Sequence, residues 1–189
     1  MKTIRVNVYK FHELSKEVQD KLVKENMERI YSGAMESINE DIDESIKKFM
    51  YYTSVSTSRC NLVVLDNQED HKLEGKYLYR RVRQLIDAYF SEPKRYYKNG
   101  KCRYSNIIIS QSCVLTGYYT DNVILSPLFA YIEGKLNVNS YHELIKACFK
   151  SVDNFIHENE EYFSSNDYIK EILENQDYDY TIDGTIVNY

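Results

Sequence analysis

Apolar side chains recur at helical spacing between residues 35 and 50. Acidic residues gather early in this segment and two lysines lie late, an arrangement that suits the dipole of a helix. A period of 3.6 residues with polar positions opposite is typical of a helix that buries one face in a core. The segment therefore predicts an amphipathic helix with the apolar stripe Met35, Ile38, Ile42, Ile46, Phe49 and Met50.

Periodicity and capping residues predict further helices. Ser15 is a good N-cap for a first helix that Gly33 would end, and Ser140 with Glu143 forms a capping box before a long helix. Pro127 would interrupt a shorter helix that Gly134 closes. Besides 35–50, the predicted helices are 16–33, 76–89, about 122–132, 140–156 and 167–175.

Alternating and apolar runs predict strands between these helices. The runs are 3–9, 60–65, 104–110 and 112–116, followed by a closing hairpin of 178–182 with 185–189. The 189 residues contain no Pro/Gly/Ser-rich linker, so we expect one domain over 1–189. The predicted fold class is α+β, with a small, mainly antiparallel sheet packed against amphipathic helices.

Charge is segregated along the chain. Residues 72–103 hold ten Lys/Arg against three Asp/Glu, whereas residues 151–189 hold ten Asp/Glu against one lysine. Summed charge of this kind steers association with other macromolecules but identifies no reaction. The acidic runs 36–44 and 153–183 have two interpretations: a decoy for a nucleic-acid-binding groove, or the ordinary solvated outer face of amphipathic helices.

The basic stretch also has two interpretations. Cations beside tyrosines offer phosphate contacts and stacking faces for nucleic acid. A solvated helix face beside a lysine-rich hairpin is the alternative, and the net charge of −5 favours it because nucleic-acid-binding domains are usually basic overall. The candidate partner- or nucleic-acid-binding residues are Lys76, Arg80, Arg83, Lys94, Arg95, Tyr96, Tyr97, Lys98, Lys101 and Arg103.

Signatures of catalysis are missing from the sequence. There is no nucleophile elbow, phosphate-binding glycine loop, His-Glu-x-x-His or Cys-x-x-Cys motif, and the four histidines are isolated. We therefore predict no enzyme, no cofactor and no metal site, although acids such as Asp66 with Asp70, or Asp121 with Glu133, leave a carboxylate site open. The four cysteines have no paired spacing and read as reduced, mostly buried residues.

Targeting and membrane-spanning patterns are absent as well. The N-terminus lacks the apolar run of a signal peptide, and no window approaches the roughly 18 apolar residues of a membrane span. We expect a cytoplasmic protein that makes no contact with a membrane.

Three stretches in order carry a family resemblance. They are Ile4-x-Val6-x-Val8-Tyr9-x-Phe11-x-Glu13-Leu14-Ser15, then Cys113-Val114-Leu115-Thr116-Gly117-Tyr118-Tyr119-x-Asp121, and a close that ends in Thr181-Ile182-Asp183-Gly184. Together they resemble a family of small accessory proteins carried by phages and integrative elements of Firmicutes. The segment 94–103 does not match that family, and the family supplies no catalytic residue.

The resemblance implies a function class. Accessory genes of such elements frequently encode inhibitors of host defence, including anti-CRISPR proteins. The leading hypothesis is thus a non-enzymatic protein that binds and inhibits a host defence nuclease complex in the bacterial cytoplasm. The alternatives are a direct nucleic-acid-binding accessory protein and, third, an enzyme built from scattered carboxylates; a homodimer is left open.

Overall fold

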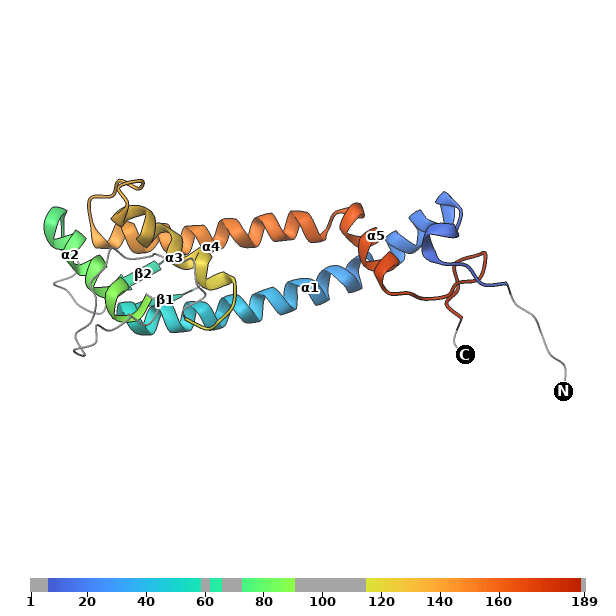
Figure 1. Ribbon diagram of the computed structural model, residues 1–189, viewed down its shortest axis with the longest axis horizontal. Coiled ribbons are helices and arrows are strands. Elements are labelled where there is room, and N and C mark those ends of the chain that lie inside the picture. Colours follow the sequence, from blue (N-terminus) through green and yellow to red (C-terminus); the bar gives the residue numbers. More distant parts are fainter. Residues whose placement is uncertain (1–6, 59–61, 66–72, 91–114, 188–189) are drawn as a thin grey trace, which may run out of the picture. The chain divides into compact units, whose positions relative to one another are not determined.

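The computed structural model describes residues 7–58, 62–65, 73–90 and 115–187 (Figure 1). The chain forms two compact units, unit 1 from residues 1–38 and 157–189 and unit 2 from residues 39–156. The described elements are η1 (Phe11–Glu13), α1 (Lys16–Thr53), β1 (Val55–Ser58), β2 (Leu62–Leu65), α2 (Gly75–Leu85), η3 (Ile86–Phe90), α3 (Thr120–Ile132), α4 (Tyr141–Phe163) and α5 (Asn166–Asn175).

The described part of the chain is mainly helical, so the predicted α+β class is wrong. Its strands are β1 and β2, four residues each, paired antiparallel with Val55 opposite Leu65. The predicted run 60–65 contains β2, but its partner β1 lies in a Thr/Ser segment where no strand was expected. A short apolar run fits a strand or a buried helix equally well until its partner is known.

The other three predicted strands lie mostly outside the described residues. Of the run 3–9, residues 7–9 are described, and in them Tyr9 makes one isolated bridge. Residues 104–114 of the strands predicted after the basic helix lie outside the described part, and Leu115 and Thr116 form a bend.

The predicted helices 16–33 and 35–50 are one continuous helix, α1. Gly33 does not end it, because a glycine in a helix interior costs only about 1 kcal/mol relative to alanine. Apart from its chain neighbours and the backbone of its own helix, no atom would lie within 4 Å of a Cβ added to Gly33. The N-terminal prediction is confirmed, since the Val18 amide donates to Ser15 Oγ at 3.4 Å. The helices predicted around α2, α3, α4 and α5 are confirmed, but the interruption predicted at Pro127 is wrong, because α3 continues through it to Ile132.

Unit 1 is closed by backbone pairing between the two ends of the chain. The amide of Tyr9 donates to the carbonyl of Tyr180 at 2.8 Å, and the reverse bond is 2.9 Å. Tyr180 also makes an isolated bridge with Ile186, so the chain turns back at the predicted closing hairpin, but the described residues 178–187 form no strand. Beneath this pairing lies a core from η1, α1, α5 and the C-terminal segment: Phe11, Leu14, Leu22, Val23, Ile30, Ile169, Leu173 and Tyr180.

Charged and polar side chains secure the same closure. Lys10 Nζ lies 2.7 Å from Asp177 Oδ1 and 2.9 Å from Asp179 Oδ1. Hydrogen bonding to these two carboxylates raises the pKa of Lys10 above its usual value. In the following turn, the Thr181 hydroxyl donates to Asp183, which is the main cause of a lowered pKa for that carboxyl group.

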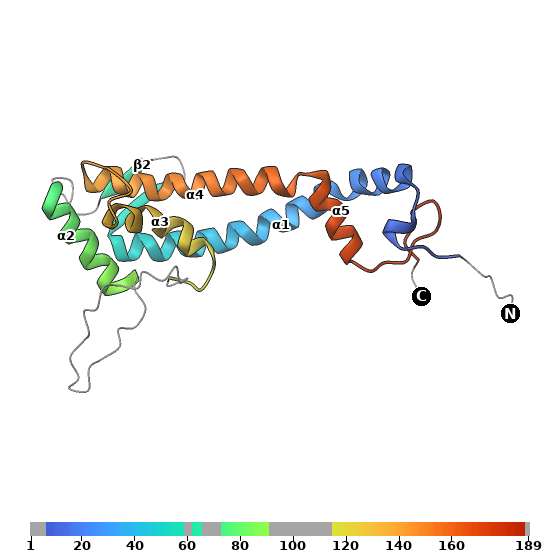
Figure 2. The same cartoon turned by 45° about the horizontal axis from the view of Figure 1, so that its top comes forward.

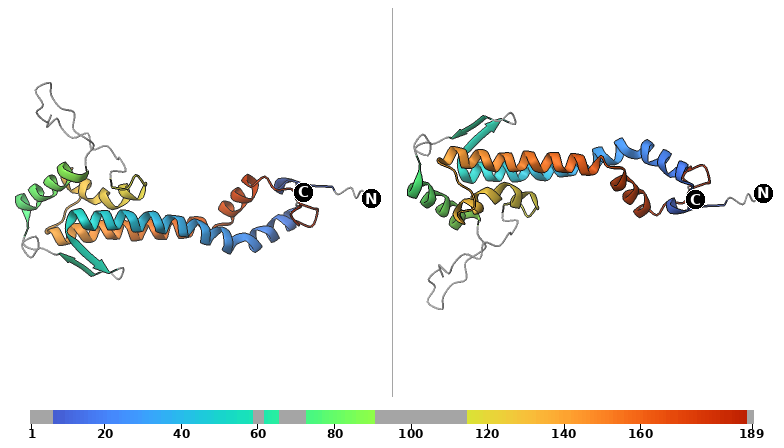
Figure 3. Two further views of the ribbon diagram at one scale, coloured as in Figure 1. Left: turned by 90° about the horizontal axis from the view of Figure 1, so that it is seen from below. Right: turned by 90° about the horizontal axis from the view of Figure 1, so that it is seen from above.

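In unit 2, the second part of α1 and the first part of α4 run antiparallel (Figure 1). Phe49 meets Phe149 edge-to-face with ring centroids 5.8 Å apart, and the Tyr141 hydroxyl donates to the Thr53 carbonyl at 3.3 Å. Figure 2 shows α3 alongside this pair, and Figure 3 shows α2 and α3 on one side of it with β1 and β2 on the other. Fully buried side chains of unit 2 include Phe49, Leu78, Val82, Ile124, Leu125, Leu128, Leu144, Ile145 and Cys148.

A pair of glycine substitutions tests the closure of unit 1. Gly184 is buried with φ +89°, and an added Cβ would lie 2.9 Å from Val18 Cγ1. Gly184→Ala should lower the free energy of unfolding by about 2 kcal/mol, because it adds backbone strain and a steric clash. Gly33→Ala is the matched control and should raise it by up to about 1 kcal/mol. Urea unfolding followed by circular dichroism measures both; equal effects would contradict the packing at Gly184.

Candidate functional site

The ten residues of the predicted binding site divide between described and undescribed parts of the chain. Lys76, Arg80 and Arg83 lie on α2. The other seven lie outside the described residues, so the structure does not show whether they join this helix: Lys94, Arg95, Tyr96, Tyr97, Lys98, Lys101 and Arg103.

Helix α2 carries four cations and no acid over eleven residues. Its apolar side is buried through Leu78 and Val82, each fully inaccessible to solvent. Lys76 and Arg80 are exposed, as predicted for the polar side of the helix. Arg83 is half-buried, and its Nε lies 3.6 Å from Asp87 Oδ2, so part of its charge is already balanced. Among the described residues, no acidic side chain pairs with Lys76 or Arg80, and both lie in the first two turns of α2.

Two tyrosines that are not among the ten predicted residues share this surface. The side chains of Tyr77 and Tyr79 are 56% and 45% exposed. Lys76 Nζ lies 5.1 Å from the centroid of the Tyr77 ring, within the range of a cation–π contact. The sequence already indicates that both tyrosines belong to the exposed side of the helix. Each is next to a cation, and other residues form the apolar side.

The most organised polar cluster in the described residues surrounds Asp121 at the start of α3. Asp121 is fully buried, and its Oδ2 accepts the amides of Leu115, Thr116 and Gly117 at 2.9, 2.8 and 3.2 Å. Its Oδ1 accepts the hydroxyls of Thr116 and Ser45 at 2.8 and 2.7 Å. The carboxylate thus ties the loop before α3 to α1.

Asp121 and Glu133 do not form the carboxylate site that the sequence left open. Glu133 lies 2.6 Å from Lys135 Nζ, and both Asp121 oxygens already accept hydrogen bonds from the protein itself. Among the described residues, no group of three or more His, Cys, Asp or Glu is placed to hold a metal ion. Asp121 therefore acts as a structural anchor rather than as a ligand.

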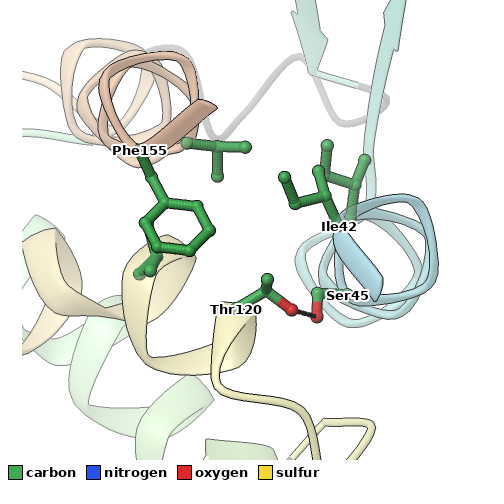
Figure 4. A pocket seen from close by; sticks show the side chains of 7 residues that line it. Ile42, Ser45, Thr120 and Phe155 are labelled. Atoms are coloured by element: carbon green, nitrogen blue, oxygen red, sulfur yellow. Dashed lines mark hydrogen bonds between the residues drawn. The ribbon is translucent and has the colours of Figure 1, made fainter. Parts of the chain in front are cut away.

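A small gap between α1, α3 and α4 lies beside this anchor (Figure 4). Ser45 and Thr120 share a hydrogen bond of 2.6 Å at one side of it, and Ile42 and Phe155 lie across from each other. Apolar side chains complete the lining, and the gap has no room for a water-sized molecule. It is therefore a packing defect and no substrate pocket.

The described cysteine is a packing residue. Cys148 is fully buried in α4, which confirms the expectation of a buried cysteine at this position. Desolvation raises the pKa of its thiol well above the usual value. The thiol is therefore protonated at neutral pH and does not act as a nucleophile. Cys60, Cys102 and Cys113 lie outside the described residues.

Comparison with known proteins adds no relative. Protein-family models, curated proteins and solved structures were compared with this chain, and none matches. The resemblance to phage accessory proteins therefore stays a prediction. Within the described ranges, no helix combines the length and apolar character that crossing a membrane requires.

The anchoring role of Asp121 is testable by an isosteric change. Asp121→Asn places an amide group among five donors, so one or more of them loses its acceptor inside the protein. We expect the free energy of unfolding to fall by about 2–4 kcal/mol. Asp153→Asn on an exposed position of α4 is the control and should change it by less than about 0.5 kcal/mol. Urea unfolding curves that do not separate the two variants would contradict the anchor.

Proposed function

We propose that the protein is a non-enzymatic product of a phage or mobile element that binds and inhibits a host defence nuclease, such as a CRISPR effector. The observation that carries the proposal is the number of exposed tyrosines among the described residues. Eight tyrosines are among their exposed large hydrophobic side chains, and the other three are Val8, Ile182 and Ile186. The exposed tyrosines are Tyr51, Tyr77, Tyr79, Tyr89, Tyr118, Tyr119, Tyr162 and Tyr178.

Tyrosine suits a surface that must be both soluble and adhesive. Its ring supplies apolar contact area and its hydroxyl remains hydrogen-bonded to water or to a partner. Tyrosine is enriched at protein–protein interfaces and at the few positions that dominate binding energy. An exposed aromatic surface made of tyrosine thus favours a protein that binds another protein.

One pair of these tyrosines lies on a loop held in place by partly buried hydrogen bonds. Tyr118 and Tyr119 follow the three amides that Asp121 accepts, and the Tyr119 side chain is 67% exposed. The Tyr119 ring centroid lies 6.1 Å from that of Phe155 on α4. Binding through a preformed loop loses less conformational entropy than binding through a mobile one. We therefore place the centre of the protein-binding surface at this pair.

Charge favours a nuclease as the partner class. The described residues of unit 1 carry fifteen Asp/Glu against six Lys/Arg. On α5, Asp167, Glu171 and Glu174 are exposed at i, i+4 and i+7, which places them along one side of the helix. Complementary charge speeds encounter and selects partners. An acidic surface of this kind complements the positively charged groove with which a nuclease holds its nucleic acid.

A capture experiment tests the proposal. Tagged protein is incubated with lysate of a CRISPR-proficient host, with and without nuclease treatment, and bound proteins are identified by mass spectrometry. We expect a defence nuclease that stays bound after treatment. Tyr118→Ser with Tyr119→Ser should reduce its recovery at least tenfold, whereas the double Phe variant, which keeps both rings, should retain most of it.

Phage plating provides the functional readout. Expression of the protein in the same host should raise the plating efficiency of a targeted phage, and the double Ser variant should not. Urea unfolding of each variant controls for folding. Failure to capture a defence nuclease together with unchanged plating efficiency would refute the proposal.

A further inference from the structure

We propose that the exposed side of α2 is a binding site for single-stranded nucleic acid. This activity is distinct from nuclease inhibition and does not depend on it. The site consists of Lys76, Tyr77, Tyr79 and Arg80, all of which are exposed in the first two turns of the helix.

The electrostatic part of the site comes from Lys76 and Arg80. They are separated by four residues, so both lie on one side of the helix, about 6 Å apart along its axis. No acidic side chain of the described residues forms an ion pair with either one, in contrast to Arg83 and its partner Asp87. Two exposed cations that pair with no acid of the described residues are suited to contact neighbouring phosphates of one strand.

The aromatic part comes from Tyr77 and Tyr79. Each ring is about half exposed and lies next to a cation in sequence. Bases stack on such rings without sequence preference, because every base has a π-face. Lys76 Nζ lies 5.1 Å from the Tyr77 ring centroid, so the charge and the ring are within reach of the same nucleotide.

The helix is anchored firmly enough to present these groups together. Leu78, Val82 and Leu85 are at most 2% exposed, and α2 packs against α3. The buried side fixes the rotation of the helix about its axis. The four exposed groups are therefore held on the outer surface in a constant arrangement.

The combination favours a single strand over two other polyanions. Bases in a duplex are stacked on one another, so Tyr77 and Tyr79 would have no base to stack on. An acidic protein segment would pair with the cations but offers no planar ring at each step. A single strand supplies repeating phosphates and unstacked bases together, which matches both parts of the site.

Fluorescence anisotropy of the full-length protein tests the site. The probes are labelled DNA and RNA strands of about 15 nucleotides and the matching DNA duplex. We expect the single strands to bind more tightly than the duplex, and the DNA and RNA arms to show which strand is preferred. Two phosphate contacts predict a loss of affinity of roughly sevenfold between about 50 and 200 mM salt.

Matched variants connect the binding to α2. Lys76→Glu with Arg80→Glu should reduce affinity more than tenfold and flatten the salt dependence. Lys146→Glu with Lys150→Glu makes the same change in net charge at exposed positions of α4 and should leave most of the affinity. Tyr77→Ala with Tyr79→Ala should cost at least tenfold, whereas the double Phe variant should bind nearly as well as the parent.

Several outcomes would overturn the proposal. The first is that neither single strand binds. The second is that the duplex binds as tightly as the single strands or more tightly. The third is that the α2 and α4 charge variants lose the same amount of affinity for the oligonucleotides. The α2 charge variant could instead bind every oligonucleotide as tightly as the parent but fail to capture a protein that the parent captures from the lysate. In that case the surface is a protein interface. Loss of oligonucleotide binding with unchanged capture of the nuclease would separate this site from the proposed inhibition.

Discussion

The arrangement of unit 2 depends on the buried carboxylate of Asp121. An ionised carboxyl group that leaves water without hydrogen bonds is destabilised by several kcal/mol, so its burial requires a full set of donors. Here three consecutive amides and two hydroxyls provide that set, and the Ser45 hydroxyl comes from α1. The loop before α3, the start of α3 and one turn of α1 are therefore positioned together. Because α2 packs on α3, its exposed side depends on the same anchor.

The motifs that carry the family resemblance have structural roles in this chain. Phe11 and Leu14 lie in the core of unit 1, Asp121 is the anchor of unit 2, and Gly184 packs against α1 where a Cβ would clash. A resemblance built on such residues predicts shared packing and leaves the binding partner open. The same motifs also contain exposed residues, among them Tyr118 and Tyr119, where the proposed recognition of a partner would take place.

Sequence reasoning succeeded where one chain segment determines the outcome. The 3.6-residue pattern predicted the positions of the helices, and the exposed placement of Lys76 and Arg80 followed from it. Sequence reasoning failed where the local structure depends on contacts with residues far away in the sequence. The strand β1 has no apolar run and exists through its pairing with β2, while Gly33 lies within α1 because its small energetic cost is outweighed by packing on both sides. The link between Ser45 and Asp121 spans 76 residues, so no local pattern could reveal it.

Contacts within the described residues neutralise only part of the charge that is segregated along the sequence. The acids nearest the chain end are used in closing unit 1, since Asp177 and Asp179 hold Lys10 and Asp183 holds its own turn. Within the described part of the chain, the acids on the exposed side of α5 make no such ion pair, and neither do Lys76 and Arg80 of α2. Charges with no internal role destabilise the folded chain slightly through repulsion of like neighbours. Within the described residues these exposed charges have no ion-pair partner, and the two cations of α2 lie beside exposed tyrosines, which is the basis of the proposed binding sites.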